Sequence, residues 1–229
     1  VTPATAVAIA GTTTLQTAAS NLTQNNFLIY EDNDALDPTA IWGNPDIGGG
    51  LENSVLNAVP VSNNPPSLGT EVRLRMNITV GTTTLSAGGQ AFQLEFVAAT
   101  DCTTAAGWAS VGVAGGGSVW RFASSSVTDA TNLSGDPPTA GDLNLSESDR
   151  AGKYAKSNPT GTNPFAVALG EDMEWDFHIE HNGADATSYC FRIAKSGGTA
   201  LNTYNSDSYP RIETRPGVGN LMRHGNFFV

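Results

Sequence analysis

The sequence predicts an all-β fold, an antiparallel β-sandwich of the immunoglobulin-like or jelly-roll type with long loops. Two stretches in which apolar and polar residues alternate carry this prediction, because side chains along a strand point alternately to the two faces of a sheet. The composition agrees with it. Charged residues make up 14% of the chain, against about 25% in an ordinary globular protein, and Thr, Asn, Ser and Gly crowd the segments between the alternating stretches.

The clearest alternation spans Glu174 to Ala194. Aromatic and aliphatic residues occupy every second position in both halves of this stretch. Asn182-Gly183 lies between the halves and suits the positive φ of a tight turn. The pattern predicts a β-hairpin, that is, two neighbouring antiparallel strands of one sheet. The polar positions of the first strand, His178 among them, are expected to form a row that faces solvent.

A second alternating stretch predicts a second hairpin. Apolar residues recur at every second position from Val72 to Val80, and the pattern resumes from Phe92 to Phe96. The polar face of the first strand carries Arg73 and Arg75, and the second carries Glu95. Opposite charges on neighbouring strands attract, so we expect these side chains to form a modest cross-strand pair.

The remaining elements are shorter. The chain is of a length that all-β proteins commonly fold as one domain, and we expect that domain at 27–214. Within it, Leu143 to Ala155 has enough helix formers for one or two helical turns. The other segments predict short strands, namely Phe27 to Tyr30, two strands between Trp108 and Phe122, Phe165 to Leu169, Leu201 to Tyr204 and Tyr209 to Ile212.

The two ends of the chain differ from the domain between them. The segment at 1–26 has no charged residue up to Gln24. It is expected to form either a first strand on its own domain or a donor strand that completes the sheet of a neighbouring subunit. The tail at 215–229 is apolar and would be unfavourable if exposed. Subunit contacts are therefore expected at Val1, Val7, Ile9 and Leu15 of the donor segment, and at Leu221, Met222, Phe227 and Phe228 of the tail.

The two cysteines indicate where the protein works. Cys102 follows one predicted strand and Cys190 lies within another. This placement favours a disulfide between them, and a pair of buried free thiols is the alternative. A disulfide implies an oxidising compartment. The chain also starts at Val1 without an initiator Met, as a mature protein does after removal of a signal peptide. We therefore expect an extracellular or cell-surface protein.

The net charge of -11 excludes some partners. It repels phosphate backbones, so no nucleic acid is expected. The mature chain has no run of 18 apolar residues, so no membrane span is expected. Sequons for N-glycosylation begin at Asn21, Asn77, Asn132 and Asn144. Such sequons are expected by chance in a chain this rich in Asn and Thr, so whether a glycan is attached stays open.

An acidic cluster follows the first predicted strand, at Glu31, Asp32, Asp34 and Asp37. Carboxylate oxygens are the ligands that a hard cation prefers, so the cluster is a candidate calcium site. It lacks the ligand spacing of an EF-hand loop, and a solvated acidic turn is the alternative. No other cofactor is expected.

Catalytic signatures are missing from the sequence. His178 and Glu180 share one face of their predicted strand while His181 turns away, so these residues do not form three convergent ligands. The chain contains no His-Glu-x-x-His, Gly-x-Ser-x-Gly or Cys-x-x-Cys motif. We therefore expect that the protein is not an enzyme.

Several of these stretches resemble a known domain. They are Val72-Arg-Leu-Arg-Met-Asn-Ile-Thr-Val80, Gly89-Gln-Ala-Phe-Gln-Leu-Glu-Phe96, Glu174-Trp-Asp-Phe177, Asn182-Gly183, Thr187-Ser-Tyr-Cys-Phe-Arg192 and Gly198-Thr-Ala-Leu-Asn-Thr-Tyr204. In this order they resemble a secreted β-domain of surface proteins from candidate-phyla-radiation (patescibacterial) bacteria. The resemblance implies a secreted β-sandwich and no assigned activity. Asp185-x-x-x-Tyr189-Cys190 also resembles the tyrosine corner of immunoglobulin-like sandwiches, which favours a sandwich over a closed barrel.

Two functions follow as expectations. The first is an extracellular structural subunit that joins identical copies into a filament or surface layer by strand exchange. The second is a surface-displayed module that binds carbohydrate or a host surface. Its platform would be Trp42, Trp108 or Trp120, or the loops from Ser124 to Pro164, because aromatic side chains bind apolar faces of ligands.

Overall fold

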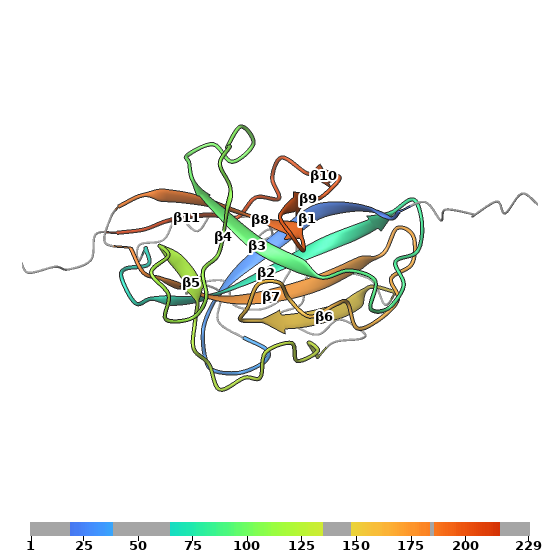
Figure 1. The fold of residues 1–229 in the computed structure, drawn as a ribbon, viewed down its shortest axis with the longest axis horizontal. Helices are drawn as coiled ribbons and strands as arrows, with labels where there is room; N and C mark the ends of the chain where they lie inside the picture. The colour runs from blue at the N-terminus through green and yellow to red at the C-terminus, as the bar shows by residue number, and fades with distance from the viewer. Residues whose placement is uncertain (1–18, 39–64, 135–147, 184–185, 216–229) are drawn as a thin grey trace, which may run out of the picture.

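The computed structural model describes residues 19–38, 65–134, 148–183 and 186–215, and places them in two β-sheets packed face to face (Figure 1). This confirms the predicted all-β sandwich. The six-stranded sheet contains β1 (Asn21–Glu31), β2 (Glu71–Gly81), β5 (Trp120–Phe122), β6 (Arg150–Ala155), β7 (Asp172–His181) and β10 (Thr203–Tyr204). The five-stranded sheet contains β3 (Phe92–Ala98), β4 (Ala109–Ser110), β8 (Ser188–Lys195), β9 (Thr199–Ala200) and β11 (Arg211–Glu213).

Neighbouring strands are mostly antiparallel. The larger sheet has the order β10-β1-β2-β7-β5, with β6 also paired to β7, and the smaller has the order β11-β8-β3-β4, with β9 paired to β8. Two pairings are parallel, β6 with β7 and β10 with β1. The long strands β1, β2 and β7 therefore form the centre of the larger sheet.

Both predicted hairpins are wrong. β2 and β3 belong to different sheets, and so do β7 and β8, so each connection crosses from one sheet to the other. Alternation reveals which face of a strand is apolar, but two strands that face each other across a core alternate in the same way as two paired neighbours. Asn182 does not turn a hairpin. Its backbone N–H donates to the carbonyl of Val119, 2.7 Å away, and fastens the start of the crossing to the residue that precedes β5.

Two boundaries also differ from expectation. β1 begins at Asn21, ahead of the domain start expected at residue 27. Arg150–Ala155 is strand β6, so the predicted helical turn is wrong there. Pairing with β7 outweighs the local helix propensity, which is a weak preference. Several predicted contact residues lie outside the described part of the chain, namely Val1, Val7, Ile9, Leu15, Trp42, Leu221, Met222, Phe227 and Phe228.

The core lies between the two sheets and is rich in aromatic side chains. Trp175 of β7 meets Phe92 of β3 edge to face, with ring centroids 5.2 Å apart. Trp120 of β5 meets Phe191 of β8 in the same way at 5.1 Å. Such edge contacts add to the free energy gained by burying the rings. Aromatic pairs therefore join the two sheets at two places.

The predicted disulfide is present. It joins Cys102, in the loop after β3, to Cys190 of β8, with Cα atoms 5.4 Å apart. The two residues are 88 positions apart in sequence, so the bond closes a long loop in the unfolded chain. Closing such a loop lowers the entropy of the unfolded state and thereby stabilises the fold.

We predict that the double variant Cys102→Ala/Cys190→Ala unfolds more easily by about 2–4 kcal/mol, because its unfolded chain regains the entropy of the open loop. Urea denaturation followed by tryptophan fluorescence measures this difference. The unaltered protein in a strong reductant should shift in the same direction, and the double variant should not respond to reductant. Equal denaturation midpoints in all four samples would contradict the prediction.

Candidate functional site

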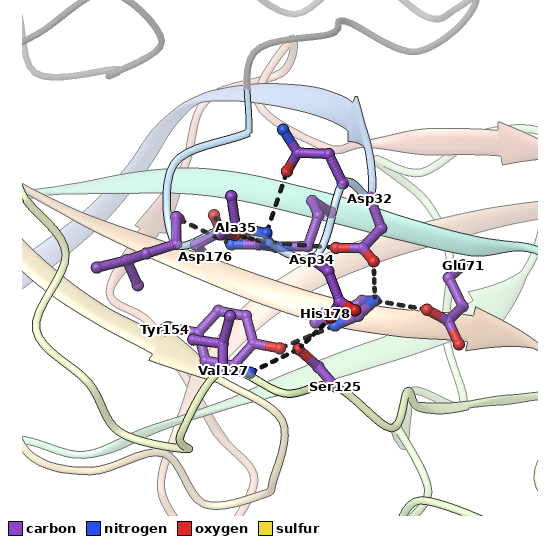
Figure 2. A network of polar contacts seen from close by, with 12 residues as sticks. Asp32, Asp34, Ala35, Glu71, Ser125, Val127, Tyr154, Asp176 and His178 are labelled. Atoms are coloured by element: carbon purple, nitrogen blue, oxygen red, sulfur yellow. Dashed lines mark hydrogen bonds and ion pairs between the residues drawn. The ribbon is translucent and has the colours of Figure 1, made fainter.

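The outer face of the six-stranded sheet carries charged side chains that are buried. Asp176 and His178 of β7 are 0% exposed, so the prediction of a solvent-facing row is wrong at these positions. The alternation places them correctly on the face opposite the core. A loop at 32–37 and the ring of Tyr154 from β6 cover that face, as the contacts of the buried side chains show (Figure 2).

Asp176 is the centre of an ionic network. The antiparallel register of β2 and β7 places Arg75 directly opposite Asp176 and Arg73 opposite His178. Arg73 donates two hydrogen bonds to the carboxylate of Asp176, from Nε at 2.9 Å and from Nη2 at 2.8 Å. Arg75 donates a third from Nε at 2.8 Å and pairs with Glu174 at 3.0 Å. Two guanidinium groups thus share one buried carboxylate.

The same two arginines fasten the loop at 32–37 to the sheet. Arg73 donates from Nη1 to the carbonyl of Ala35 at 2.6 Å and from Nη2 to the carbonyl of Leu36 at 3.0 Å. Arg75 pairs through Nη2 with a carboxylate oxygen of Asp37 at 3.1 Å. Charge-assisted hydrogen bonds are stronger than neutral ones. The loop is therefore held by groups that are themselves oriented by Asp176.

Aromatic rings cover the guanidinium groups. The Cζ atom of Arg73 lies 4.7 Å from the centroid of the Tyr154 ring, and that of Arg75 lies 5.8 Å from the Tyr30 ring. A ring face attracts a cation and excludes water from it. Burial alone would raise the pKa of Asp176, but the charges and hydrogen bonds of Arg75 and Arg73 outweigh it and hold the pKa below its ordinary value.

A second group of side chains lies at the rim of this network. The Nε2 atom of His178 is 3.1 Å from a carboxylate oxygen of Glu71 and 3.7 Å from one of Asp32. Figure 2 shows His178 between these carboxylates and Tyr154, which lies on the other side of the ring. The Tyr154 hydroxyl is 2.8 Å from Nδ1 of His178. Ligand atoms of Asp32, Glu71 and His178 all lie within 4.8 Å of one another, so this rim offers three ligand atoms to a cation.

The electrostatics of the rim are dominated by negative charge. Burial raises the pKa of Glu71, and the carboxylates of Asp32, Glu180 and Asp34 add to the rise. Burial lowers the pKa of His178, and the charge of Asp32 opposes part of that effect. A neutral imidazole beside carboxylates is the protonation state in which histidine binds metals.

The predicted calcium ligands do not act as one cluster. Asp32 lies at the rim, whereas Asp37 pairs with Arg75 and accepts a hydrogen bond from Ser134. Asp34 accepts hydrogen bonds from the hydroxyls of Ser125 and Ser126, each at 3.3 Å. Glu31 is exposed at the end of β1. Sequence reasoning missed Glu71 and His178 as companions of Asp32, because the three residues meet only through the pairing of three strands.

The cross-strand pair predicted between Glu95 and Arg73 or Arg75 does not form, because Glu95 has another partner. Glu95 bonds to Arg192 of β8, at 2.8 Å from Nε, on the outer face of the five-stranded sheet. Trp108 lies over this guanidinium with its ring centroid 4.5 Å from Cζ and stacks on Tyr209 at 5.9 Å. Trp120 is buried in the core. A carbohydrate platform at Trp120 is therefore wrong, and Trp108 already has contacts within the chain.

A pocket of about 340 Å³ adjoins these aromatic rings. Its lining combines an aromatic ring, carboxylates, hydroxyls and a guanidinium, from Thr100, Asp101, Cys102, Thr103, Ser206, Asp207, Tyr209 and Arg211. Its volume lies within the range of small-molecule sites, about 300–1,000 Å³. The disulfide lies in its wall, so oxidation fixes one side of the pocket.

Comparisons with known proteins assign the chain to no family. No family model matches the chain, and no curated protein matches it. The resemblance to a secreted surface domain therefore stays a prediction. In the described part of the chain, no helix has the length and apolar character needed to cross a membrane.

We predict that Asp176→Asn lowers the free energy of unfolding by about 3–5 kcal/mol, because it leaves two buried guanidinium groups without their shared counter-charge. The matched control is Glu180→Gln. It removes a partly exposed pair with Arg121 and should cost about 0–1 kcal/mol. Chemical denaturation of both variants at neutral pH measures the difference, and similar losses would contradict the assignment of Asp176 as the centre of the network.

The same network makes the stability of the fold depend on pH. Because the folded-state pKa of Asp176 is lowered, the unfolded chain binds a proton at this residue before the folded chain does. The stabilisation is therefore complete above the ordinary carboxyl pKa of about 3.9 and is lost as the pH falls through the lower folded value. The Asp176→Asn variant should lack this component of the acid denaturation curve.

Proposed function

We propose that the chain is an extracellular structural subunit that joins identical copies head to tail into a filament or surface layer. The observation that carries this proposal is the position of the two chain ends of the described sandwich. β1 begins and β11 ends at opposite ends of it (Figure 1).

Strand register supports the opposite placement of the ends. Asn21 pairs with Gly81, close to the start of β7, because Thr79 pairs with Asp172. At the other end, the backbone of Arg215 bonds to Pro66, and that of Gly69 bonds to His181, the last residue of β7. The start of β1 and the end of β11 thus lie near opposite ends of β7.

Each chain end also emerges near the border of a sheet. Only β10 lies outside β1 among the described strands, and it pairs with β1 at Thr23 and Gln24. β11 is the outermost described strand of the other sheet. The charge-free segment 1–18 is therefore joined to β1, one strand in from the border of its sheet, and the apolar tail 216–229 is joined to β11, at the border of the other sheet. At a sheet border, a strand from another molecule can extend the sheet.

A contact between one end of a subunit and the opposite end of the next is heterologous. Such a contact produces an open chain when its rotation does not close into a ring. The donor segment would contribute Val1, Val7, Ile9 and Leu15 to the next subunit. The disulfide Cys102–Cys190 supports an oxidising, extracytoplasmic setting for this assembly.

A second function, binding of carbohydrate, is favoured by the pocket beside the disulfide. Tyr209 brings an aromatic ring to the pocket wall, where it also stacks on Trp108 and Tyr204. Asp207 offers a carboxylate for the hydroxyls of a sugar. Arg211 supplies hydrogen-bond donors on the same wall. This mixture of groups fits a neutral saccharide better than an anion, because Asp101 adds a second carboxylate.

We predict that the full chain forms polymers and that deletion of residues 1–18 gives monomers, because the deletion removes the donor segment and leaves β1 intact. Light scattering after size-exclusion chromatography measures the mass. The double variant Ile9→Asp/Leu15→Asp should also be monomeric, since charge cannot enter an apolar groove without a large cost. The matched control Thr12→Asp/Thr13→Asp adds the same charge at polar positions and should still assemble. A monomeric full chain, or assembly by the deletion variant, would refute the role of this segment.

For carbohydrate, we predict that Tyr209→Ala removes binding to a glycan array, because the pocket loses its aromatic wall, while Tyr209→Phe retains binding. An array of neutral and N-acetylated oligosaccharides is the probe. No saccharide bound by the unaltered protein, or equal binding by Tyr209→Ala, would exclude this second function.

A further inference from the structure

We propose that Asp32, Glu71 and His178 form a binding site for a divalent first-row transition-metal ion, for which Zn²⁺ fits best. The proposal is independent of assembly. It replaces the acidic cluster expected from the sequence with donors from three elements. Asp32 comes from the loop after β1, Glu71 from the start of β2 and His178 from β7.

The spacing of the donor atoms matches a coordination sphere. Bonds of about 2.0–2.1 Å from zinc to nitrogen or oxygen place neighbouring tetrahedral ligands about 3.4 Å apart. Nε2 of His178 lies 3.1 Å from Glu71 and 3.7 Å from Asp32, on either side of that value. The ligand atoms of all three residues lie within 4.8 Å of one another, so rotation of the two carboxylates can bring them to this spacing.

The imidazole is already oriented as a ligand. His178 is 0% exposed, and its Nδ1 atom is 2.8 Å from the Tyr154 hydroxyl, so Nε2 points at the carboxylates. The backbone N–H of Val127 donates to the Ser125 hydroxyl oxygen, and Ser125 in turn interacts with the Tyr154 hydroxyl. Metal-binding histidines commonly have such a partner on the second nitrogen, which fixes the tautomer and the ring.

The mixture of donors selects the class of ion. Imidazole nitrogen suits Zn²⁺ and its neighbours in the first transition row, whereas Ca²⁺ prefers six to eight oxygen ligands. One nitrogen and two carboxylates leave a fourth tetrahedral position for water. The Glu71 side chain is 36% exposed, so the site has an open side through which an ion can enter.

The local charge also favours a cation. Glu180 lies directly opposite Glu71 in the register of β2 and β7, and the carboxylates of Asp32 and Glu71 both face the His178 imidazole. Arg73 meets Asp32 at 3.4 Å, a longer contact than its 2.8 Å pair with Asp176. Arg73 therefore holds Asp32 less tightly than it holds Asp176. A bound ion would join the loop at 32–37 to β2 and β7.

The test uses the full chain without a histidine tag, stripped with a chelator and titrated with ZnCl₂ by isothermal calorimetry. We expect one ion per chain and a rise in the thermal midpoint. Glu71→Gln, a change at the exposed rim that leaves the buried network intact, should weaken binding at least about tenfold. Tyr154→Phe should weaken it about 10–100-fold through the loss of the orienting hydroxyl. CaCl₂ should bind more weakly than ZnCl₂.

Two controls separate this site from adventitious binding. Glu180→Gln removes a nearby charge that is not a ligand and should change the affinity less than Glu71→Gln. His224→Gln removes a histidine of the tail and should leave binding unchanged. Co²⁺ loaded in place of Zn²⁺ should give visible absorption bands that Glu71→Gln alters. No binding of Zn²⁺, loss of binding in His224→Gln, or unchanged affinity in Glu71→Gln would overturn the proposal.

Discussion

The structure depends on one carboxylate that is shared by two buried guanidinium groups. Asp176 lies opposite Arg75 in the register of β7 and β2. Arg73, two positions away on the same face of β2, also donates to Asp176. Breaking such a pair leaves an uncompensated buried charge, which costs more than a surface ion pair contributes. The network therefore allows a charged sheet face to be covered by a loop and by aromatic rings. The loop and these rings form a further layer outside the six-stranded sheet.

Burial of this face explains how the candidate site arises. The loop at 32–37 is held by the arginines, and this contact brings Asp32 next to Glu71 and His178. The proposed metal site at the rim thus depends on the network and is not a separate motif. Loss of the network should displace Asp32 and so disturb the rim, even though Asp176 itself offers no atom to the ion.

Much of the fold could be predicted from the sequence, and the site could not. The alternation at 72–80 and 174–180 correctly indicated strands and their core faces, and Cys102 and Cys190 indicated a disulfide. The sheet to which each strand belongs could not be read, because alternation is identical for paired strands and for strands that face each other. The burial of His178 depends on a loop distant in sequence, and the pairing of Glu71, Asp32 and His178 depends on registers that no local pattern specifies. The one or two helical turns expected between Leu143 and Ala155 are wrong over β6 for the same reason, since pairing with β7 decides its conformation.

A sandwich in which β1 begins and β11 ends at opposite ends is suited to a linear assembly. The disulfide, the aromatic contacts across the core and the ionic network all stabilise one conformation of the subunit. The most direct test is electron cryomicroscopy of the full chain at high concentration. The account predicts filaments or layers whose repeat contains one sandwich, with density for the first residues of each subunit added as a strand to a sheet of the next. Monodisperse particles in which those residues fold back on their own sheet would contradict it.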